Sequence, residues 1–487
     1  MRKKHYIATV LIIFFAVYQS VGQSGISLYH LTNSTFQGNH FNAAFFPEGK
    51  FFLGLPVISG IYVDANSPVS YNDISTTDEQ GVGQWDIDNF VRLADERNYI
   101  QAEAEISSFY MGFRPKNSLG FSIFIRERIT ANGFYGDDEL QFVWNGNAGL
   151  VGRGVDLSST LIDARYYREY GLGIWRSIPN RGINIGFRAK FLNGMISAIT
   201  DSNFTGDVGI GQDYEHDFNV AGARLNTSGM NILDSDELTS HLISNGNVGF
   251  GIDFGAHWKI NDYVSAAVAV NDLGYINWKT DPESHLLQDT TFRFEGVDLQ
   301  NIDNFGEALD SLLDKFQDST IYEAFRTGLN TRAFGSMFLQ LTENDLFSAT
   351  IGGYLVQDQL KMQYALGYTR KVGDILKASV NVIRTPQQGF DLGVGLAGTF
   401  GPVQIYMSSD KLIKVWNVPE TKAVDLRFGI NFVFGRTKTV KDDRSDLQHP
   451  SPWSKKEKVE ESDGIYWIIK KQHPRPVYQY PKGVRKD

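Results

Sequence analysis

The chain has 487 residues, enough for two or three soluble domains or for one large barrel. Its 48 glycines and 13% aromatic residues, against only 14 prolines, favour an all-β protein. The net charge of −10 is spread along the chain, which argues against nucleic acid as a partner, and the sequence has no cysteine to form a disulfide.

The N-terminus has the layout of a secretory signal peptide. Three basic residues at 2–4 precede an apolar run over 7–18, and the small residues within 20–22 form a cleavage site. The alternative, a membrane anchor, needs a longer apolar run. We therefore predict a signal peptide over 1–22. No later stretch holds 18 uninterrupted apolar residues, so any membrane span after it must belong to a barrel.

The segment that follows the signal peptide, 23–50, contains the phrase NHFNAAFFPEGK. It is apolar and aromatic but lacks the alternation of a strand. We expect it to fold into the barrel lumen as a plug or hatch, with contacts from Asn42, Phe45, Phe46 and Pro47. The alternative is that it lies across the periplasmic mouth.

Fourteen runs alternate between apolar and polar residues, as strands with two different faces do. They are 51–63, 98–113, 119–130, 160–176, 182–195, 246–258, 263–274, 330–341, 347–356, 360–371, 375–384, 390–400, 403–410 and 423–434.

The gaps between these runs alternate between short and long. The long ones are 64–97, 131–159, 196–245 and 275–329. A membrane barrel has short turns on its periplasmic side and long loops outside, whereas a soluble sandwich has no reason to sort its loops in this way. We therefore predict a transmembrane antiparallel up-and-down β-barrel of about 14 strands over 51–434. Its apolar faces would contact outer-membrane lipid, and both termini would be periplasmic.

Two segments outside the strands have patterns of their own. In 303–326, apolar residues recur at helical spacing and predict a short helix, either a lid on neighbouring loops or a partner helix. They are Phe305, Leu309, Leu312, Leu313 and Phe316. Residues 435–487 form a polar, predominantly basic tail. We expect this tail to be periplasmic, disordered in isolation, and a possible contact for outer-membrane or periplasmic proteins.

Charged residues recur on the lumen side of the second to fifth predicted strands. With turns at 114–117 and 177–180, the predicted facing pairs are Glu105 with Arg126, Glu103 with Arg128, Glu169 with Arg188, and Tyr167 with Lys190. Facing opposite charges stabilise a sheet by roughly 0.2–1 kcal/mol per pair. This ladder is interpreted either as a selectivity or gating surface or as charge balancing inside a wet lumen.

Two charged residues, Glu127 and Arg168, have the parity of the lipid-facing positions. A charge that faces lipid at mid-depth costs about 2–4 kcal/mol. Three explanations follow: a bulge turns the pair inward, the two side chains pair with each other, or a partner protein covers this face.

Catalytic chemistry finds little support. Of the histidines after the signal peptide, only His257 lies on a predicted strand, in register with Asp253, and a structural histidine is the simpler reading. We find no spacing typical of a metal or cofactor site. We therefore expect no enzyme activity, no catalytic residues, no metal and no cofactor.

Several phrases, among them HFNAAFFPEGKFFLGLP (40–56), YREYGLGIWRSIPNRGINIGFRAKFLNG (167–194) and VDLRFGINFVFG (424–435), resemble an uncharacterised family of Bacteroidota outer-membrane proteins. The family is similar in architecture to the fourteen-stranded fatty-acid porin FadL and to the secretion barrel PorV. Those relatives have an Asn-Pro-Ala motif in their plug. Asn42-Ala43-Ala44 stands at the comparable place here and lacks the proline.

The leading functional hypothesis is a porin-like barrel that transports or holds a small hydrophobic solute. Parity places Phe109, Met111 and Phe113 in the lumen as apolar ligand contacts. The alternative is a non-catalytic subunit or scaffold of an outer-membrane secretion or assembly machine. The basic tail, Glu127 and Arg168 favour that alternative.

Overall fold

The computed structural model describes residues 25–77, 83–146, 148–201, 205–211, 216–230, 246–287, 290–294, 318–356, 359–385, 389–412, 418–435, 459–462 and 465–468. The predicted signal peptide and most of the predicted tail lie outside these residues. Within them, no helix combines the length and apolar character needed to cross a membrane.

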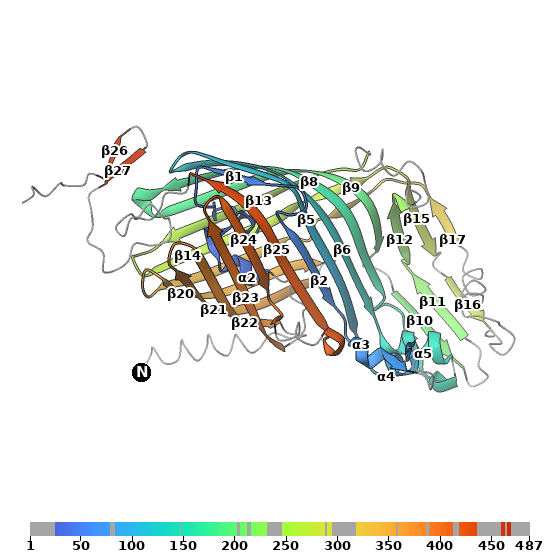
Figure 1. Ribbon diagram of the computed structural model, residues 1–487. Coiled ribbons are helices and arrows are strands. Elements are labelled where there is room, and N and C mark those ends of the chain that lie inside the picture. Colours follow the sequence, from blue (N-terminus) through green and yellow to red (C-terminus); the bar gives the residue numbers. More distant parts are fainter. Residues whose placement is uncertain are drawn as a thin grey trace, which may run out of the picture.

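Fourteen strand positions form one closed antiparallel barrel (Figure 1). In barrel order they are β1 (Phe51–Gly54) with β2 (Ile61–Asn66), β5 (Asn98–Lys116), β6 (Leu119–Tyr135), β8 (Leu161–Ile178), β9 (Ile183–Thr200), β13 (Val248–Lys259), β14 (Val264–Trp278), β19 (Arg332–Gln340), β20 (Asp345–Val356), β21 (Gln359–Val372), β22 (Leu376–Thr385), β23 (Gly389–Phe400), β24 (Val403–Ser409) and β25 (Ala423–Phe434). The barrel closes because β1 and β2 pair with β25 on one side and with β5 on the other.

The barrel wall is apolar outside and polar inside. Large apolar side chains stand exposed on the outer face of most strands, and Leu172 of β8 is 63% exposed. The residues between them point inward and are mostly polar or charged and buried. This arrangement is the one a barrel needs in a bilayer, and it fits an outer-membrane location.

The predicted all-β barrel of about 14 strands is confirmed. Six connections of two to four residues lie together at one end, which we call the short-turn end. They are 117–118, 179–182, 260–263, 341–344, 373–375 and 401–402. One predicted strand, 51–63, is broken into β1 and β2, because the chain leaves the ladder after Gly54, passes through Pro56 and turns at Val57, whose φ is 65°.

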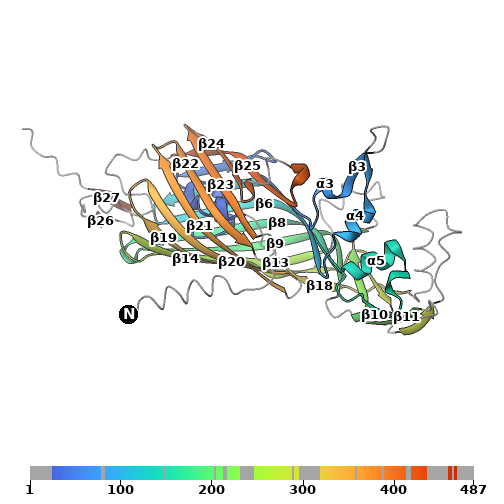
Figure 2. The same ribbon diagram turned by 90° about the horizontal axis from the view of Figure 1, so that it is seen from below.

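The opposite end, the long-loop end, carries more structure than the sequence suggested (Figure 2). Helices α3 (Tyr71–Ile74), α4 (Ile87–Arg92) and α5 (Asp137–Asn145) lie there, with the hairpin β3 (Ser75–Thr77) and β4 (Gly83–Trp85). A separate four-stranded sheet consists of β7 (Gly154–Asp156), β10 (Thr205–Ile210), β11 (His216–Ala221) and β16 (Thr290–Phe294).

Four further strands extend the barrel wall at this end. They are β12 (Arg224–Ser228), β15 (Pro282–Leu287), β17 (Asp318–Ile321) and β18 (Phe325–Gly328). The helix expected over 303–326 is therefore wrong in its last part, where β17 and β18 pair with β15 and β14. Its apolar residues 305–316 lie outside the described residues.

The N-terminal segment, residues 25–47, lies inside the barrel, where Figure 1 shows its first helix, α2 (Ile26–Tyr29). The 3-10 turns η1 (Thr32–Ser34) and η2 (Phe36–His40) follow. Nearly all of the segment is buried. In the C-terminal region, the described part is a hairpin of β26 (Val459–Ser462) and β27 (Ile465–Ile468).

Candidate functional site in the barrel lumen

The N-terminal segment is held at its beginning by the carboxylate of Asp410. This side chain accepts hydrogen bonds from the backbone N–H groups of Gly25, Ile26 and Ser27 at 2.5, 2.7 and 2.8 Å. It therefore satisfies three of the N–H groups that a helix start leaves without partners. Its own backbone N–H donates to Asp425, at 2.9 Å to Oδ1, which fixes the position of the residue.

The middle of the segment is seated on two glycines of the wall. Gly186 of β9 and Gly255 of β13 are direct register partners. A Cβ at Gly186 would come within 1.9 Å of the carbonyl oxygen of Ala43, and one at Gly255 within 2.1 Å of the Asn42 side chain. The backbone of 42–44 thus approaches the wall so closely that only glycine fits at both positions.

The predicted plug residues all make contacts inside the barrel. The Asn42 side chain accepts a hydrogen bond from the Ala44 N–H at 2.9 Å. Phe45 packs on Tyr29 and on two wall residues, His257 and Phe338.

At the short-turn end, the Phe46 ring stacks on Trp175 with centroids 5.5 Å apart. The carbonyl oxygen of Pro47 accepts a hydrogen bond from Arg114 at 2.5 Å. The segment is therefore bound to the wall along its whole length.

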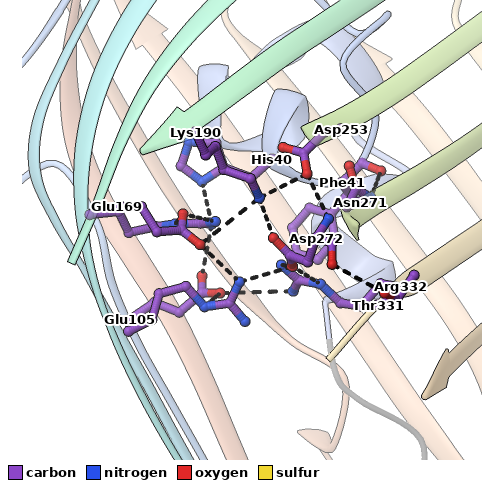
Figure 3. Close-up of polar contacts among 12 residues, drawn as sticks. His40, Phe41, Glu105, Glu169, Lys190, Asp253, Asn271, Asp272, Thr331 and Arg332 are labelled. Carbon is purple, nitrogen blue, oxygen red and sulfur yellow. Dashed lines mark hydrogen bonds and ion pairs between the residues drawn. The ribbon is translucent and has the colours of Figure 1, made fainter. Parts of the chain in front are cut away.

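Above the segment, towards the long-loop end, buried ionic side chains fill the lumen. We call this set the central charge cluster. Its members are Glu103, Glu105, Arg126, Arg128, Glu169, Arg188, Lys190, Asp253, Asp272, Arg332 and Arg427. Figure 3 shows how side chains from separate strands converge there around His40 and Phe41.

Three carboxylates each contact several cations. Asp272 lies 3.0 Å from Arg128 and 2.6 Å from Arg332, and it also contacts Lys190. Glu169 approaches Arg126 at 2.6 Å. Glu105 lies 2.8 Å from Arg427 of β25 and 3.8 Å from Arg332 of β19. These contacts join strands that are not neighbours, so the cluster ties the walls of the barrel together.

The N-terminal segment takes part in this cluster. Arg126 lies 3.0 Å from Nδ1 of His40, and Arg188 donates to the His40 carbonyl oxygen at 3.0 Å. Burial, followed by the positive charges of Arg126 and Arg188, lowers the pKa of His40 well below its usual range. His40 is therefore neutral in this position and can accept a hydrogen bond from Arg126.

The predicted register of the ladder in β5 and β6 is wrong by two residues, although its ion pairs form. Glu105 faces Arg128, Ser107 faces Arg126, and Glu103 faces Thr130. The turn occupies 117–118 rather than the expected 114–117, which displaces the register at the hairpin by four residues, and irregularities between 113 and 116 and between 107 and 109 reduce the displacement to two. Glu103 still reaches Arg128 at 3.1 Å, and Glu105 reaches Arg126 at 3.6 Å, as diagonal neighbours.

The predicted register of β8 and β9 is wrong by four residues. Glu169 faces Leu192, and Tyr167 faces Gly194. The turn occupies 179–182, with Gly182 at a φ of 64°, rather than the 177–180 expected. Consequently Arg188 pairs with Asp253 at 2.7 Å, and Lys190 lies 2.8 Å from Asp253 and 3.9 Å from Glu169.

The outward charges Glu127 and Arg168 face each other in register and form an ion pair at 2.6 Å. The alternation of burial persists through both residues, so neither turns inward. Glu127 also accepts hydrogen bonds from Tyr166 at 3.1 Å and from Ser108 at 3.4 Å. Mutual pairing lowers the cost of these charges on the lipid face.

The placement of Phe109, Met111 and Phe113 in the lumen is wrong. The irregularity at Ser107 and Phe109 shifts the phase of the strand, so Tyr110 and Gly112 point inward instead. Phe113 is 51% exposed on the outer face. A single bulge moves every later side chain on its strand to the opposite face of the sheet. Within an apolar run, a bulge of one residue cannot be recognised from the sequence.

Apolar contacts inside the lumen come from residues that the sequence analysis did not select. Tyr29, Phe41 and Phe45 of the N-terminal segment pack against Phe334 and Phe338 of β19. His257 belongs to the same region, where its Nε2 lies 3.1 Å from Ser265 Oγ. Its ring packs against Phe45 and Phe338, and a structural role for it stays a prediction.

At the long-loop end, contacts across the lumen link β5 with β20, which lies on the opposite side of the barrel. The Tyr99 hydroxyl lies 3.3 Å from the Tyr354 hydroxyl, and Gln101 donates to Tyr354 at 3.2 Å. Lys361 of β21 extends to the rings of Tyr99 and Phe134, with its ammonium 3.8 and 4.4 Å from the ring centroids.

A family model described as a family of unknown function, DUF5723, matches residues 44–410. The chain belongs to this family. No curated protein matches the sequence. The family match gives no function; the barrel itself had been predicted from the alternation of apolar and polar residues and from the loop lengths.

Solved structures similar to this DUF5723 member include the toluene transporter TodX of Pseudomonas putida, with 9% identity, a TM-score of 0.39, and coverage of 82% of this chain and 91% of that one. The toluene transporter TbuX of Ralstonia pickettii has 9% identity, a TM-score of 0.38, and coverage of 80% and 91%. A FadL homologue of Pseudomonas aeruginosa has 10% identity, a TM-score of 0.39, and coverage of 81% and 92%.

Proposed function

We propose that this DUF5723 protein is a non-enzymatic outer-membrane channel or binding barrel for a small hydrophobic solute, with residues 25–47 as its plug. The observation that carries the proposal is how this segment is held in the lumen. Asp410 accepts hydrogen bonds from its first residues, and its backbone packs closely against Gly186 and Gly255. Such a segment closes a barrel while it is docked and opens a path when it moves.

Rings from the segment and the wall provide an apolar surface for the solute. Phe41 and Phe45 leave the wall residues Phe334 and Phe338 whenever the segment is displaced, and a hydrophobic molecule can then replace them. The central charge cluster sits beside this surface and would act as the gating element, because His40 and Phe41 contact it directly.

We further place the protein in the outer membrane of a Gram-negative bacterium, with the short-turn end and both termini in the periplasm. The sorting of turns and loops between the two ends supports this orientation. Cleavage of the signal peptide after residue 22 would leave a mature chain that starts close to the Asp410 seat.

A second candidate is a subunit of an outer-membrane complex. The Glu127–Arg168 pair favours it, because both side chains remain partly exposed, at 13% and 21%, on a face that otherwise contacts lipid. A neighbouring barrel that covers the pair would remove it from lipid. The tail 435–487 would supply a further contact in the periplasm.

Native mass spectrometry of tagged protein, extracted from the outer membrane in a gentle detergent, tests both candidates. If the protein is a channel or binding barrel, we expect the mass of a single chain plus that of a small hydrophobic molecule. Stoichiometric partner chains would instead support the subunit proposal, and deletion of 435–487 would then show whether the tail recruits them. A single chain without added mass counts against both.

A further inference from the structure

Lys361 is the exception among the buried cations of the lumen. The other buried Lys and Arg side chains in the described part of the chain each contact a carboxylate. They are Arg126, Arg128, Arg165, Arg188, Lys190, Arg332, Lys411 and Arg427. Lys361 is 2% exposed, and its Nζ has no hydrogen-bond partner among the described residues.

Among the described residues, the contacts found for the Lys361 ammonium are with aromatic faces. Its Nζ lies between the rings of Tyr99 on β5 and Phe134 on β6. The one charged side chain found to act on it among the described residues is Arg97, which is also a cation. Aromatic faces attract a cation, but they compensate only part of the cost of removing it from water.

Lys361 also lies where a solute would enter. It is the third residue of β21, next to the loop end of the strand, and it reaches across the lumen to β5. The contact between the Tyr99 and Tyr354 hydroxyls and the bond from Gln101 lie in the same layer. This layer separates the central charge cluster from the long-loop end.

We propose that Lys361 is the recognition residue for an anionic group, a carboxylate or a phosphate, carried by the solute of this barrel. An anion that approaches from the long-loop end would form an ion pair with the ammonium and draw it away from the Tyr99 and Phe134 rings. The same movement would open the layer, and the rings would then contact the carbon chain of the solute. This inference rests on the proposed channel function and narrows its solute to an amphiphile.

A phenol hydroxyl completes the site. Tyr354 is the register partner of Lys361, and its hydroxyl can donate to the second oxygen of a carboxylate or phosphate once its contact with Tyr99 opens. The Tyr99 hydroxyl donates to Asn132 at 2.6 Å, so Tyr99 offers the solute its ring. One cation and one hydroxyl donor form a first set of contacts for either anion. Carboxylate and phosphate therefore share this chemistry, and the experiment distinguishes them.

The test uses calorimetry of the full chain in a nonionic detergent with three probes of equal chain length: decanoate, decyl phosphate and decanol. We expect the wild type to bind at least one of the two anions roughly tenfold or more tightly than decanol, as a charge-assisted contact predicts. Lys361→Met should lose this preference and keep the affinity for decanol, whereas Lys361→Arg should retain it.

Lys371→Met is the matched control, because Lys371 lies on the same strand at the short-turn end, next to Asp374. It should leave all three affinities unchanged. If Lys361→Met fails to fold, the wild-type preference and the Lys361→Arg result still decide the matter.

The outcomes separate the two proposals. Preference for only one of the anions supports the inference and identifies the group. Equal binding of decanol and both anions to wild type overturns the role of Lys361 and leaves the channel proposal standing. Anion preference that survives in Lys361→Met also overturns it. If no probe binds any variant, the solute proposal itself is wrong, and the inference that rests on it is wrong with it.

Discussion

The central charge cluster and the surroundings of Lys361 differ in how they compensate buried charge. Within the cluster every cation contacts a carboxylate, and Asp272 alone contacts three cations. Nearer the long-loop end, Lys361 contacts two aromatic rings and no carboxylate among the described residues, although Arg165 and Lys411 in the same half each pair with one. Buried charges that satisfy one another indicate a fixed element, whereas a buried charge without an ionic partner indicates a place where a ligand supplies it.

The largest effect is expected in the central charge cluster. Asp272→Asn leaves Arg128, Arg332 and Lys190 without their shared carboxylate, which should destabilise the barrel by about 3–5 kcal/mol. Urea unfolding in detergent, followed by gel mobility, measures this loss. Asp345→Asn is the control, since Asp345 pairs with the exposed Arg370 at the short-turn end and should matter little. Equal effects from both variants would show that the cluster is not a structural unit.

The outward pair should respond to single but not to double substitution. Glu127→Leu leaves Arg168 alone on the lipid face, at an expected cost of about 2–4 kcal/mol, whereas Glu127→Leu with Arg168→Leu restores an apolar wall. A double-mutant cycle from unfolding in lipid vesicles gives the coupling. An additive result would contradict the pairing. Loss of a copurifying chain in the double variant would favour the subunit proposal.

The seat of the N-terminal segment can be disturbed by a single methyl group. Gly186→Ala places a Cβ on the Ala43 carbonyl and should displace the segment, so that residues 25–47 become sensitive to a protease added to the detergent-solubilised protein. Gly133→Ala is the control, because no atom lies within 4 Å of the Cβ it would gain. Protection that is identical in the two variants would argue against close seating.

Acid should weaken docking of the same segment. Burial lowers the pKa of His30 to about 4, and that of His40 falls well below 6.5 through burial and the charges of Arg126 and Arg188. Since both docked pKa values lie below the ordinary one, docking is strongest above pH 6.5 and weakens as the pH falls below it. At His40, the negative charge of Glu105 raises the pKa, and the positive charge of Arg427 lowers it further. Protease sensitivity between pH 7.5 and 5 should rise in wild type and rise less in His30→Asn/His40→Asn. A pH-independent pattern would contradict this linkage.

Sequence patterns were sufficient for the barrel because strand alternation and loop length are local properties. They did not predict the strand register or the direction of side chains where an irregularity shifts the hydrogen-bond ladder. The turn at 117–118 and the irregularities of the ladder set Glu105 opposite Arg128 instead of Arg126, and the irregularity near Ser107 turned Phe109, Met111 and Phe113 outward. The ion pairs of Glu103 and Glu105 formed nevertheless, because long side chains reach diagonal neighbours.

Contacts between side chains across the lumen could not be predicted from the sequence. Asp272, Arg332 and Arg427 lie on strands far apart in the chain, and no local pattern shows that their side chains meet. Lys361 could not be singled out from the sequence either, because it differs from the other buried cations in having no carboxylate contact among the described residues. Lumen parity does identify Arg332, Lys361 and Arg427 as inward residues, whereas Asp272 points inward only because an irregularity in the ladder of β13 and β14 changes the phase of its strand. A charge count around the closed barrel is the sequence signal that could have found the other three.

A reversible lock between the N-terminal segment and the wall tests whether residues 25–47 close the lumen. Ser27 Oγ and Asn381 Nδ2 lie 3.0 Å apart, so Ser27→Cys with Asn381→Cys should form a disulfide between the segment and the wall, in a chain with no native cysteine. Conductance in planar bilayers is measured for the Gly186→Ala background carrying this pair. We expect the barrel to be closed when the disulfide is oxidised and open after its reduction. Equal conductance in both states would contradict it.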